Sequence, residues 1–241
     1  MSNTIRSNWR RTQRNQIIGF CHPLHPNLEP SIELSYCLGV LKGDGFVHVH
    51  HSKKRCDSII GLNVNDFEFA DTFANALKKI GLNPKIISLK EYAHSTTNWR
   101  TIAYSFEFVE WYNELTLPEI VNLLGNYRNY ILAFFQGLYE SEGCFWMERE
   151  GHQKWGNPRC MITVSNTDKD LLITFQALMS KLGFDFRLYQ CKTGRIRYLN
   201  SHIAHFRKPV FRLDLQKREQ VRNLLLEIQP CIARKQWRED A

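Results

Sequence analysis

The chain of 241 residues lacks the features of several protein classes. It has no apolar run near the ~18 residues that a membrane-spanning helix needs, and its N-terminus has no apolar segment of the kind found in secretory signals. Its seven cysteines are odd in number, and no two stand at the C-x-x-C spacing of zinc sites and redox motifs. We therefore expect free thiols, a reducing intracellular compartment and no contact with a membrane.

The chain has an excess of positive charge, with 32 Lys and Arg residues against 24 Asp and Glu residues. The excess is densest between residues 187 and 222, where ten Lys or Arg residues face only Asp214 and Glu219, with aromatic residues such as Tyr189 interspersed. This composition is typical of a surface that binds a polyanion, and a solvated strand face would look the same.

The sequence repeats itself. Residues 37–45 resemble residues 135–143: both have a glycine at the third position, a small residue at the seventh, then an acid and a glycine. Residues 66–81 resemble residues 168–183 in the same order. Matches that recur in one order indicate a duplicated unit.

Each copy predicts the same order of elements, αββαββα. The first copy is expected to hold a helix from a Ser31 cap to about Asp44, a hairpin of 46–50 with 59–64, a helix ending at Gly81, a strand pair of 85–90 with 101–109, and a closing helix. The second is expected to hold a helix over 126–142, a hairpin of 144–150 with 159–164, a helix ending at Gly183, a strand pair of 186–191 with 209–215, and a closing helix. A weaker match of 105–108 with 210–213 places these two segments in equivalent strands. The prediction is an α+β fold with a basic arm at 1–31, one repeat at 32–125 and a second at 126–241.

Small residues recur at a spacing of four in both motif helices, as Gly39 with Gly43 and as Gly137 with Ser141. Missing or small side chains on one helix face let two backbones approach closely. We therefore expect the two motif helices to pack against each other and to relate the copies by a pseudo-two-fold axis.

An acid follows each of these helices, Asp44 in the first copy and Glu142 in the second. Two carboxylates side by side at helix C-termini repel each other, so the arrangement favours a bound hard cation, Mg²⁺ first. Metal-assisted phosphodiester hydrolysis is the chemistry that such a pair supports. For one motif alone, an exposed acid in an unrelated loop is the commoner explanation, but two motifs in a duplicated frame favour the metal site.

The two nonapeptides resemble the motifs of the single-chain, two-motif LAGLIDADG homing endonucleases, and the repeat that carries the resemblance covers residues 32–236. The resemblance implies antiparallel sheets that form a DNA-binding saddle, and a monomeric, intron-encoded enzyme that breaks both strands of a long asymmetric DNA target with Mg²⁺, which Mn²⁺ or Ca²⁺ can replace in binding. Two alternatives stay open: an intron maturase that binds its own intron RNA, and a DNA-binding regulator. An organelle and a prokaryotic cytoplasm are both compatible locations.

The resemblance also implies roles for particular residues. Lys235, in the segment 228–236, would lie near the scissile phosphate or orient water, and we expect its replacement to leave the stability of the fold unchanged. In the first copy Arg128 is the candidate for the matching basic residue, followed by Lys90. Asn65 and Asn166 would contact the metal–water network, with Thr167 as the alternative to Asn166. The backbone carbonyls of Gly43 and Ser141 would complete the metal shell. Four positions depart from the motif. Cys37 and Phe135 replace its leading Leu, Lys42 stands where an acid is common, and Glu142 keeps the carboxylate of the usual Asp.

A two-stranded ribbon fits the major groove of DNA, where alternate side chains can contact base edges. The candidates in the first copy are His48, His50, Lys53, Arg55, Asn63, Lys85, Lys90 and Arg100. Those in the second copy are Glu148, Glu150, Lys154, Arg159, Arg187, Tyr189, Lys192, Arg195 and Arg197. The pattern does not decide which of the two alternating faces contacts DNA.

Overall fold

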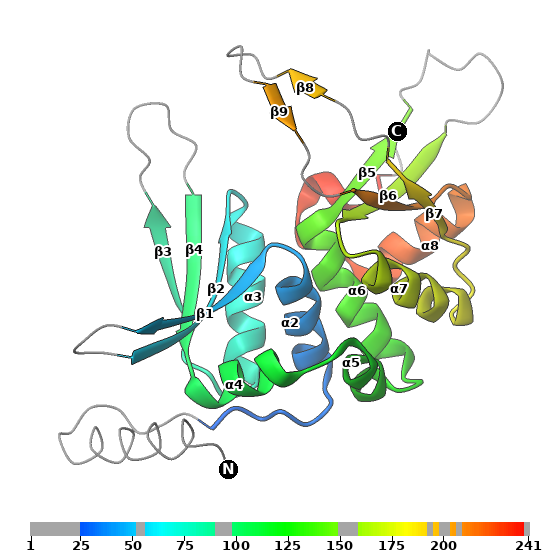
Figure 1. The fold of residues 1–241 in the computed structure, drawn as a ribbon. Helices are drawn as coiled ribbons and strands as arrows, with labels where there is room; N and C mark the ends of the chain where they lie inside the picture. The colour runs from blue at the N-terminus through cyan, green and yellow to red at the C-terminus, as the bar shows by residue number, and fades with distance from the viewer. Residues whose placement is uncertain are drawn as a thin grey trace, which may run out of the picture.

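The structure is a computed structural model that describes residues 25–51, 56–89, 98–148, 159–191, 195–197, 203–205 and 209–238 (Figure 1). The described residues form two units of similar design, each with a four-stranded antiparallel sheet and helices packed on one of its faces. The predicted α+β fold of two tandem αββαββα units is confirmed.

The first unit begins with helix α2 (Ile32–Lys42) and the hairpin of β1 (Gly45–His51) and β2 (Cys56–Val64). It continues with α3 (Phe67–Lys79), β3 (Lys85–Leu89), β4 (Asn98–Tyr104), α4 (Phe106–Glu114) and α5 (Leu117–Leu124). The strand order in its sheet is β1-β2-β4-β3.

The second unit begins with α6 (Arg128–Glu142), β5 (Gly143–Met147) and β6 (Cys160–Asn166). It continues with α7 (Lys169–Lys181), β7 (Arg187–Gln190), β10 (Phe211–Leu215) and α8 (Arg218–Ile228), and the strand order is β5-β6-β10-β7. Two further strands, β8 (Arg195–Arg197) and β9 (Ile203–His205), pair only with each other, and a short 3₁₀ turn, η1 (Ala233–Lys235), follows α8.

Local signals explain where the helices begin and end. Ser31 caps α2, with its hydroxyl oxygen accepting a hydrogen bond from the amide of Leu34 at 3.1 Å. Gly81 and Gly183, just beyond α3 and α7, both have φ +91°, a conformation that side chains disfavour. Both glycine stops are confirmed.

One strand prediction was too long, and two elements were not expected. The strand predicted over 101–109 ends at Tyr104, because Ser105 accepts from the amide of Phe108 at 3.2 Å and starts α4. The weak match of 105–108 with 210–213 is therefore wrong, since the first segment begins a helix while the second lies at β10. The equivalent of β10 is β4, which pairs with β2 as β10 pairs with β6. The β8–β9 pair was not predicted.

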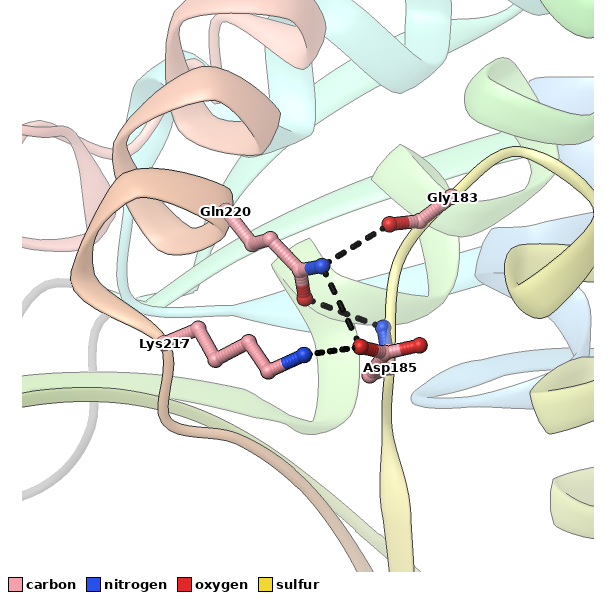
Figure 2. A network of polar contacts seen from close by, with 4 residues as sticks. All are labelled: Gly183, Asp185, Lys217 and Gln220. Atoms are coloured by element: carbon pink, nitrogen blue, oxygen red, sulfur yellow. Dashed lines mark hydrogen bonds and ion pairs between the residues drawn. The ribbon is translucent and has the colours of Figure 1, made fainter.

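A polar network holds the turn after α7 against the start of α8 (Figure 2). The Gln220 amide nitrogen donates to the Gly183 carbonyl at 3.0 Å, and its oxygen accepts from the Asp185 amide at 3.0 Å. Lys217 forms an ion pair with the Asp185 carboxylate. These contacts fix the backbone just before β7 and thus the position of that edge strand.

Candidate active site and nucleic-acid interface

Helices α2 and α6 pack at the centre of the molecule, between the two sheets (Figure 1). A Cβ atom on Gly39 would lie 2.0 Å from the carbonyl oxygen of Phe134, and one on Gly137 would lie 2.3 Å from the carbonyl oxygen of Tyr36. Each glycine thus sits against the backbone of the other helix. The predicted close, reciprocal packing of the motif helices is confirmed.

This packing brings the two acids together. A Cβ atom on Gly43 would lie 2.3 Å from the Cβ of Ser141, so the helices are still in contact where Asp44 and Glu142 emerge. Burial raises the pKa of both carboxyl groups above the ordinary range, and the charge of Asp44 raises that of Glu142 further. Lys235 acts on both pKa values in the opposite direction.

Lys235 is buried, with only 4% of its surface exposed, and it caps the C-terminal end of α6. Its ammonium donates to the carbonyls of Glu140 at 2.7 Å and Tyr139 at 3.0 Å, with the Ser141 carbonyl at 3.4 Å. The Tyr139 hydroxyl donates back to the Lys235 carbonyl at 3.0 Å. Burial lowers the pKa of Lys235 to about 8. The expectation that Lys235 does not contribute to the stability of the fold is therefore wrong, because its loss would leave buried carbonyls without a hydrogen-bond donor.

A pocket of about 560 Å³ lies beside the acids, next to the end of β2, the end of β3 and the start of β4. Its walls bring together seven residues that the sequence singled out: Asp44, Asn63, Asn65, Arg100, Ser141, Glu142 and Lys235. Arg234 also lines it and donates to the carboxylate of Asp66 at 2.7 Å, which ties the C-terminal segment to the first unit.

Two other candidates lie elsewhere. Arg128 is at the opposite end of α6, whose 15 residues place it about 20 Å from Glu142 along the helix axis. Its guanidinium donates to both carboxylate oxygens of Glu227, at 2.6 and 2.7 Å, so its candidacy as the basic residue of the first copy that matches Lys235 is corrected. Lys90, the second choice, lies outside the described residues. Asn166 donates to the carbonyl of Lys42 at 3.3 Å, at the end of α2 and not in the pocket.

The two motifs differ at their sixth position, where sequence reasoning noted Lys42 but missed Glu140. Glu140 is a buried carboxylate that accepts from the Tyr36 hydroxyl at 2.5 Å and from the Cys231 amide at 2.7 Å. Lys42 is half-buried, its ammonium lies 5.3 Å from the centre of the Tyr112 ring, and burial lowers its pKa. Glu140 thus joins both helices and the C-terminal segment, and a comparison of the two sixth positions could have pointed to it.

The registers of the sheets settle which side chains face away from the helices. In the first sheet Ile60, Leu62 and Ala103 are buried toward the helices, so the alternate residues lie on the open face. Four of the candidates share this face, His48, Asn63, Lys85 and Arg100, and Arg100 donates to the Asn63 side chain at 2.7 Å. His50 lies in β1, while Lys53, Arg55 and Lys90 fall outside the described residues.

The second sheet has the same alternation, with Ile162, Val164 and Leu213 toward the helices. Four candidates lie on its open face: Glu148, Arg159, Arg187 and Tyr189. Arg195 and Arg197 lie in β8, and Glu150, Lys154 and Lys192 fall outside the described residues. Sequence reasoning missed four residues of this face: Trp146, Thr163, Arg212 and Asp214.

The donor set at the centre suits a hard divalent cation. Two carboxylates at crowded helix ends, with backbone carbonyls next to them, offer oxygen ligands whose mutual repulsion a cation would relieve. In the part of the chain that the structure describes, no group of three or more His, Cys, Asp or Glu side chains is placed to hold a metal. The five described cysteines are all free, and no described helix has the length and apolar character of a membrane span.

Residues 129–229, from the start of α6 to the end of α8, match the family described as LAGLIDADG-like domain. Two proteins of Methanocaldococcus jannaschii are similar to this chain. Uncharacterized protein MJ0314 is 28% identical over 171 residues, 71% of this chain and 62% of that protein. Uncharacterized protein MJ0398 is 28% identical over 213 residues, 88% of this chain and 72% of that protein. The chain therefore spans less than two thirds of the length of MJ0314.

Solved structures of I-DmoI, a homing endonuclease, share the fold. I-DmoI in complex with DNA and Mn is 18% identical, with a TM-score of 0.52 over 79% of this chain and 92% of that chain. I-DmoI in complex with DNA and Ca is 19% identical, with a TM-score of 0.53 over 82% of this chain and 88% of that chain.

Proposed function

The chain carries a LAGLIDADG-like domain and has the fold of a LAGLIDADG homing endonuclease, and from this premise we propose that it is itself a site-specific DNA endonuclease. Its substrate would be a long asymmetric DNA duplex, in which it makes a double-strand break as a monomer. We assign residues 32–125 to one repeat, residues 126–241 to the other, and residues 1–31 to an arm that contacts the DNA backbone.

One observation supports this function most directly: each repeat contributes one carboxylate, and the pair meets where the two central helices end. Asp44 and Glu142 are held there by backbone packing that leaves no room for side chains at Gly39 and Gly137. A fold could bury such glycines without placing an acid at both helix ends. Burial raises the pKa values of both carboxyl groups, and the charge of Asp44 raises that of Glu142 further, which supports a role for a bound cation at this pair.

The carboxylates of Asp44 and Glu142, with the carbonyls of Gly43 and Ser141, would hold Mg²⁺, and the I-DmoI complexes with Mn and Ca support a divalent ion. Bound metal would supply a Lewis acid for the phosphate and a more acidic water.

The residues of this chain then have distinct tasks. The Lys235 ammonium would hold positive charge beside the scissile phosphate, and the exposed Asn65 amide, in the same pocket, would orient the attacking water. Asn166 would act through the end of α2, where its amide holds the Lys42 carbonyl. The open faces of the two sheets would lie in the major groove on either side of the cut.

The test uses DNA selected by the protein. Wild-type protein selects bound duplexes from a randomised pool, and the selected duplex is then incubated with Mg²⁺. We expect the wild type to break both strands. Asp44→Asn and Glu142→Gln should slow cleavage by at least ~10³-fold and bind the duplex within about threefold of wild type, because each removes a metal ligand and no groove contact.

Cleavage by either variant at a wild-type rate in saturating Mg²⁺ would overturn the assignment of the acids. Preferential enrichment of structured RNA from a parallel RNA pool, with no cleavage of DNA, would instead indicate the maturase function.

A further inference from the structure

We propose that Arg212, held in place by the buried carboxylate of Asp214, recognises one guanine in the half of the DNA target that lies under the second sheet. The inference rests on the proposed function, since it names a base that the enzyme selects. It concerns the open face of β10 and its neighbours β6 and β7, away from the acids.

The first step is the burial of Asp214. Its side chain has no exposed surface, although it lies on the sheet face that is turned away from the helices. Each carboxylate oxygen has a partner: one accepts from the Thr163 hydroxyl at 2.8 Å, and the other accepts from the Arg212 guanidinium at 2.8 Å. Asp214 therefore cannot contact a base itself, and its negative charge is balanced by partners within the sheet.

The second step is that the fold does not require an acid there. In the first sheet the residue at the matching position of β4 is Ile102: Lys85 pairs with it as Arg187 pairs with Asp214. An apolar residue is thus sufficient to build this sheet, and a buried carboxylate is costly unless it has a task. The task that the contacts indicate is to fix one edge of the Arg212 guanidinium.

The third step is the position of Arg212. Its guanidinium carbon lies 5.8 Å from the centre of the Tyr189 ring on β7, so the group is held by a carboxylate at one edge and an aromatic face beside it. The side chain remains 40% exposed, and its Nε is buried with no hydrogen-bond partner in the described structure. The network around Asp185 holds the backbone just before β7, the strand that carries Tyr189 (Figure 2).

These features favour guanine over other ligands of the groove. Guanine presents two acceptors, O6 and N7, at the spacing of an arginine's paired donors. A guanidinium that is already fixed loses little conformational freedom on binding, and this favours a base with a defined geometry over a phosphate of variable position. The exposed part of the Arg212 side chain lies on this open face, where a base edge can approach it.

The experiment compares base preferences and not only affinities. Full-length wild type, Arg212→Met, Asp214→Asn and Lys181→Met each select from one pool of randomised duplexes without Mg²⁺. Lys181→Met is the matched control, because it also removes one positive charge but lies exposed at the end of α7, on the helix side of the second sheet.

We expect wild type and Lys181→Met to select the same consensus. Arg212→Met should lose a roughly 5- to 100-fold preference for guanine at one base pair only, the range of one bidentate contact. Asp214→Asn should weaken the preference at that same base pair. In case these variants fold poorly, wild-type protein is also measured on a duplex with 7-deazaguanine at that position, which lacks the N7 acceptor, and binding should fall by at least fivefold.

A uniform loss of affinity with an unchanged consensus would show a phosphate contact or a purely structural pair, and would overturn the inference while leaving the proposed function intact. Unchanged binding to 7-deazaguanine would also overturn it. Failure of the wild type to enrich any duplex would overturn the proposed function, and this inference with it.

Discussion

The two sheets share a backbone plan, but their open faces carry different chemistry at matching positions. The second row of the open face, counted outward from the acids, is Phe46, Gly61, Ile102 and Lys85 in the first sheet and Cys144, Thr163, Asp214 and Arg187 in the second. In the first sheet the Phe46 ring covers Gly61 so closely that a Cβ there would lie 2.4 Å from its tip. The matching place in the second sheet holds the hydroxyl that binds Asp214.

This difference shows which parts of the repeat are constrained. The glycines that let α2 and α6 touch, and the acid after each helix, occur in both units because they build one shared centre. The open faces have no such shared centre: the second row of the first sheet has Phe46, Gly61 and Ile102 beside one lysine, while that of the second sheet holds the buried carboxylate that binds Arg212. A target bound by both faces must therefore be asymmetric in chemistry as well as in sequence.

The prediction with the largest expected effect compares the C-terminal ends of α2 and α6. It tests whether the contacts at these two ends have different roles. Lys235 donates to the carbonyls at the end of α6, while the Tyr112 hydroxyl donates to the Leu41 carbonyl at the end of α2 at 3.1 Å. Lys235→Met should slow single-turnover cleavage by ~10²-fold or more, because a fixed positive charge beside the phosphate is lost. It should also lower Tm by roughly 4–8 °C, the scale of about 2 kcal/mol in a chain of this size.

Tyr112→Phe is the matched change in the other unit. It should lower Tm by a few degrees and leave the cleavage rate within about twofold, because only one neutral hydrogen bond is lost. Equal loss of rate in both variants would mean that the two ends serve catalysis alike.

The next prediction, with a smaller expected effect, concerns the apolar side chains on the open face of the first sheet. Ile87 and Tyr104 are 44% and 47% exposed on it, beside the partly exposed Ile59 and Ile102. Apolar side chains in the major groove contact the methyl group of thymine. Replacing single thymines by deoxyuridine in the half of the selected duplex under this sheet should weaken binding by about fourfold at each contacted methyl.

The same replacement in the other half, which Arg212→Met identifies, should change binding by less than about 1.5-fold, because the described open face of the second sheet has no Ile, Leu or Val side chain, and the only large hydrophobic side chains exposed on it are the rings of Trp146 and Tyr189. Equal sensitivity of both halves, measured by titration of labelled duplexes, would contradict the contrast between the sheets.

The smallest effect concerns the acids, the one feature that both units share. Their pKa values are raised in the folded, metal-free protein, so the ionised pair destabilises the fold above those pKa values, and the penalty disappears as pH falls through them. In EDTA at neutral pH, Glu142→Gln should therefore raise Tm by about 1–3 °C, and Asp44→Asn should change it in the same direction.

Below the ordinary pKa values of these carboxyl groups, where both the folded and the unfolded chain are protonated, the two variants should melt like wild type. Saturating Mg²⁺ at neutral pH should reverse the order, because only wild type has both ligands. A lower Tm for Glu142→Gln in EDTA at neutral pH would show that the carboxylate stabilises the metal-free fold.

Periodicity and the internal repeat were enough to predict the fold and the central acids, because those features depend on residues close together in the chain. Gly39 and Gly43 lie on one face of a helix and indicate that this face packs closely, and Asp44 follows them directly in the sequence. The registers could not be assigned to a face in advance, since Phe46 and Ile59 make the open face of the first sheet almost as apolar as the side that packs on the helices.

The errors share a physical cause, which is contact between distant segments. The sequence around Lys235 does not indicate that its ammonium donates to a carbonyl 95 positions earlier. The polar residues beside it suggest instead that the side chain is exposed to solvent. Arg128 was chosen for its place shortly before a motif helix, but a residue before a helix lies far from one after it. Asp214 lies in a basic stretch of the sequence, and one of its two partners, Thr163, comes near only through the pairing of β10 with β6, while the other, Arg212, lies on its own strand.

The segment after α8 has a consequence for how such a protein can change over generations. Arg234 binds Asp66 across 168 positions, so the end of the second unit completes the wall of a pocket in the first. The two units are thereby structurally interdependent. A recombination event that exchanged one whole unit for that of a relative would separate Asp66 from its partner.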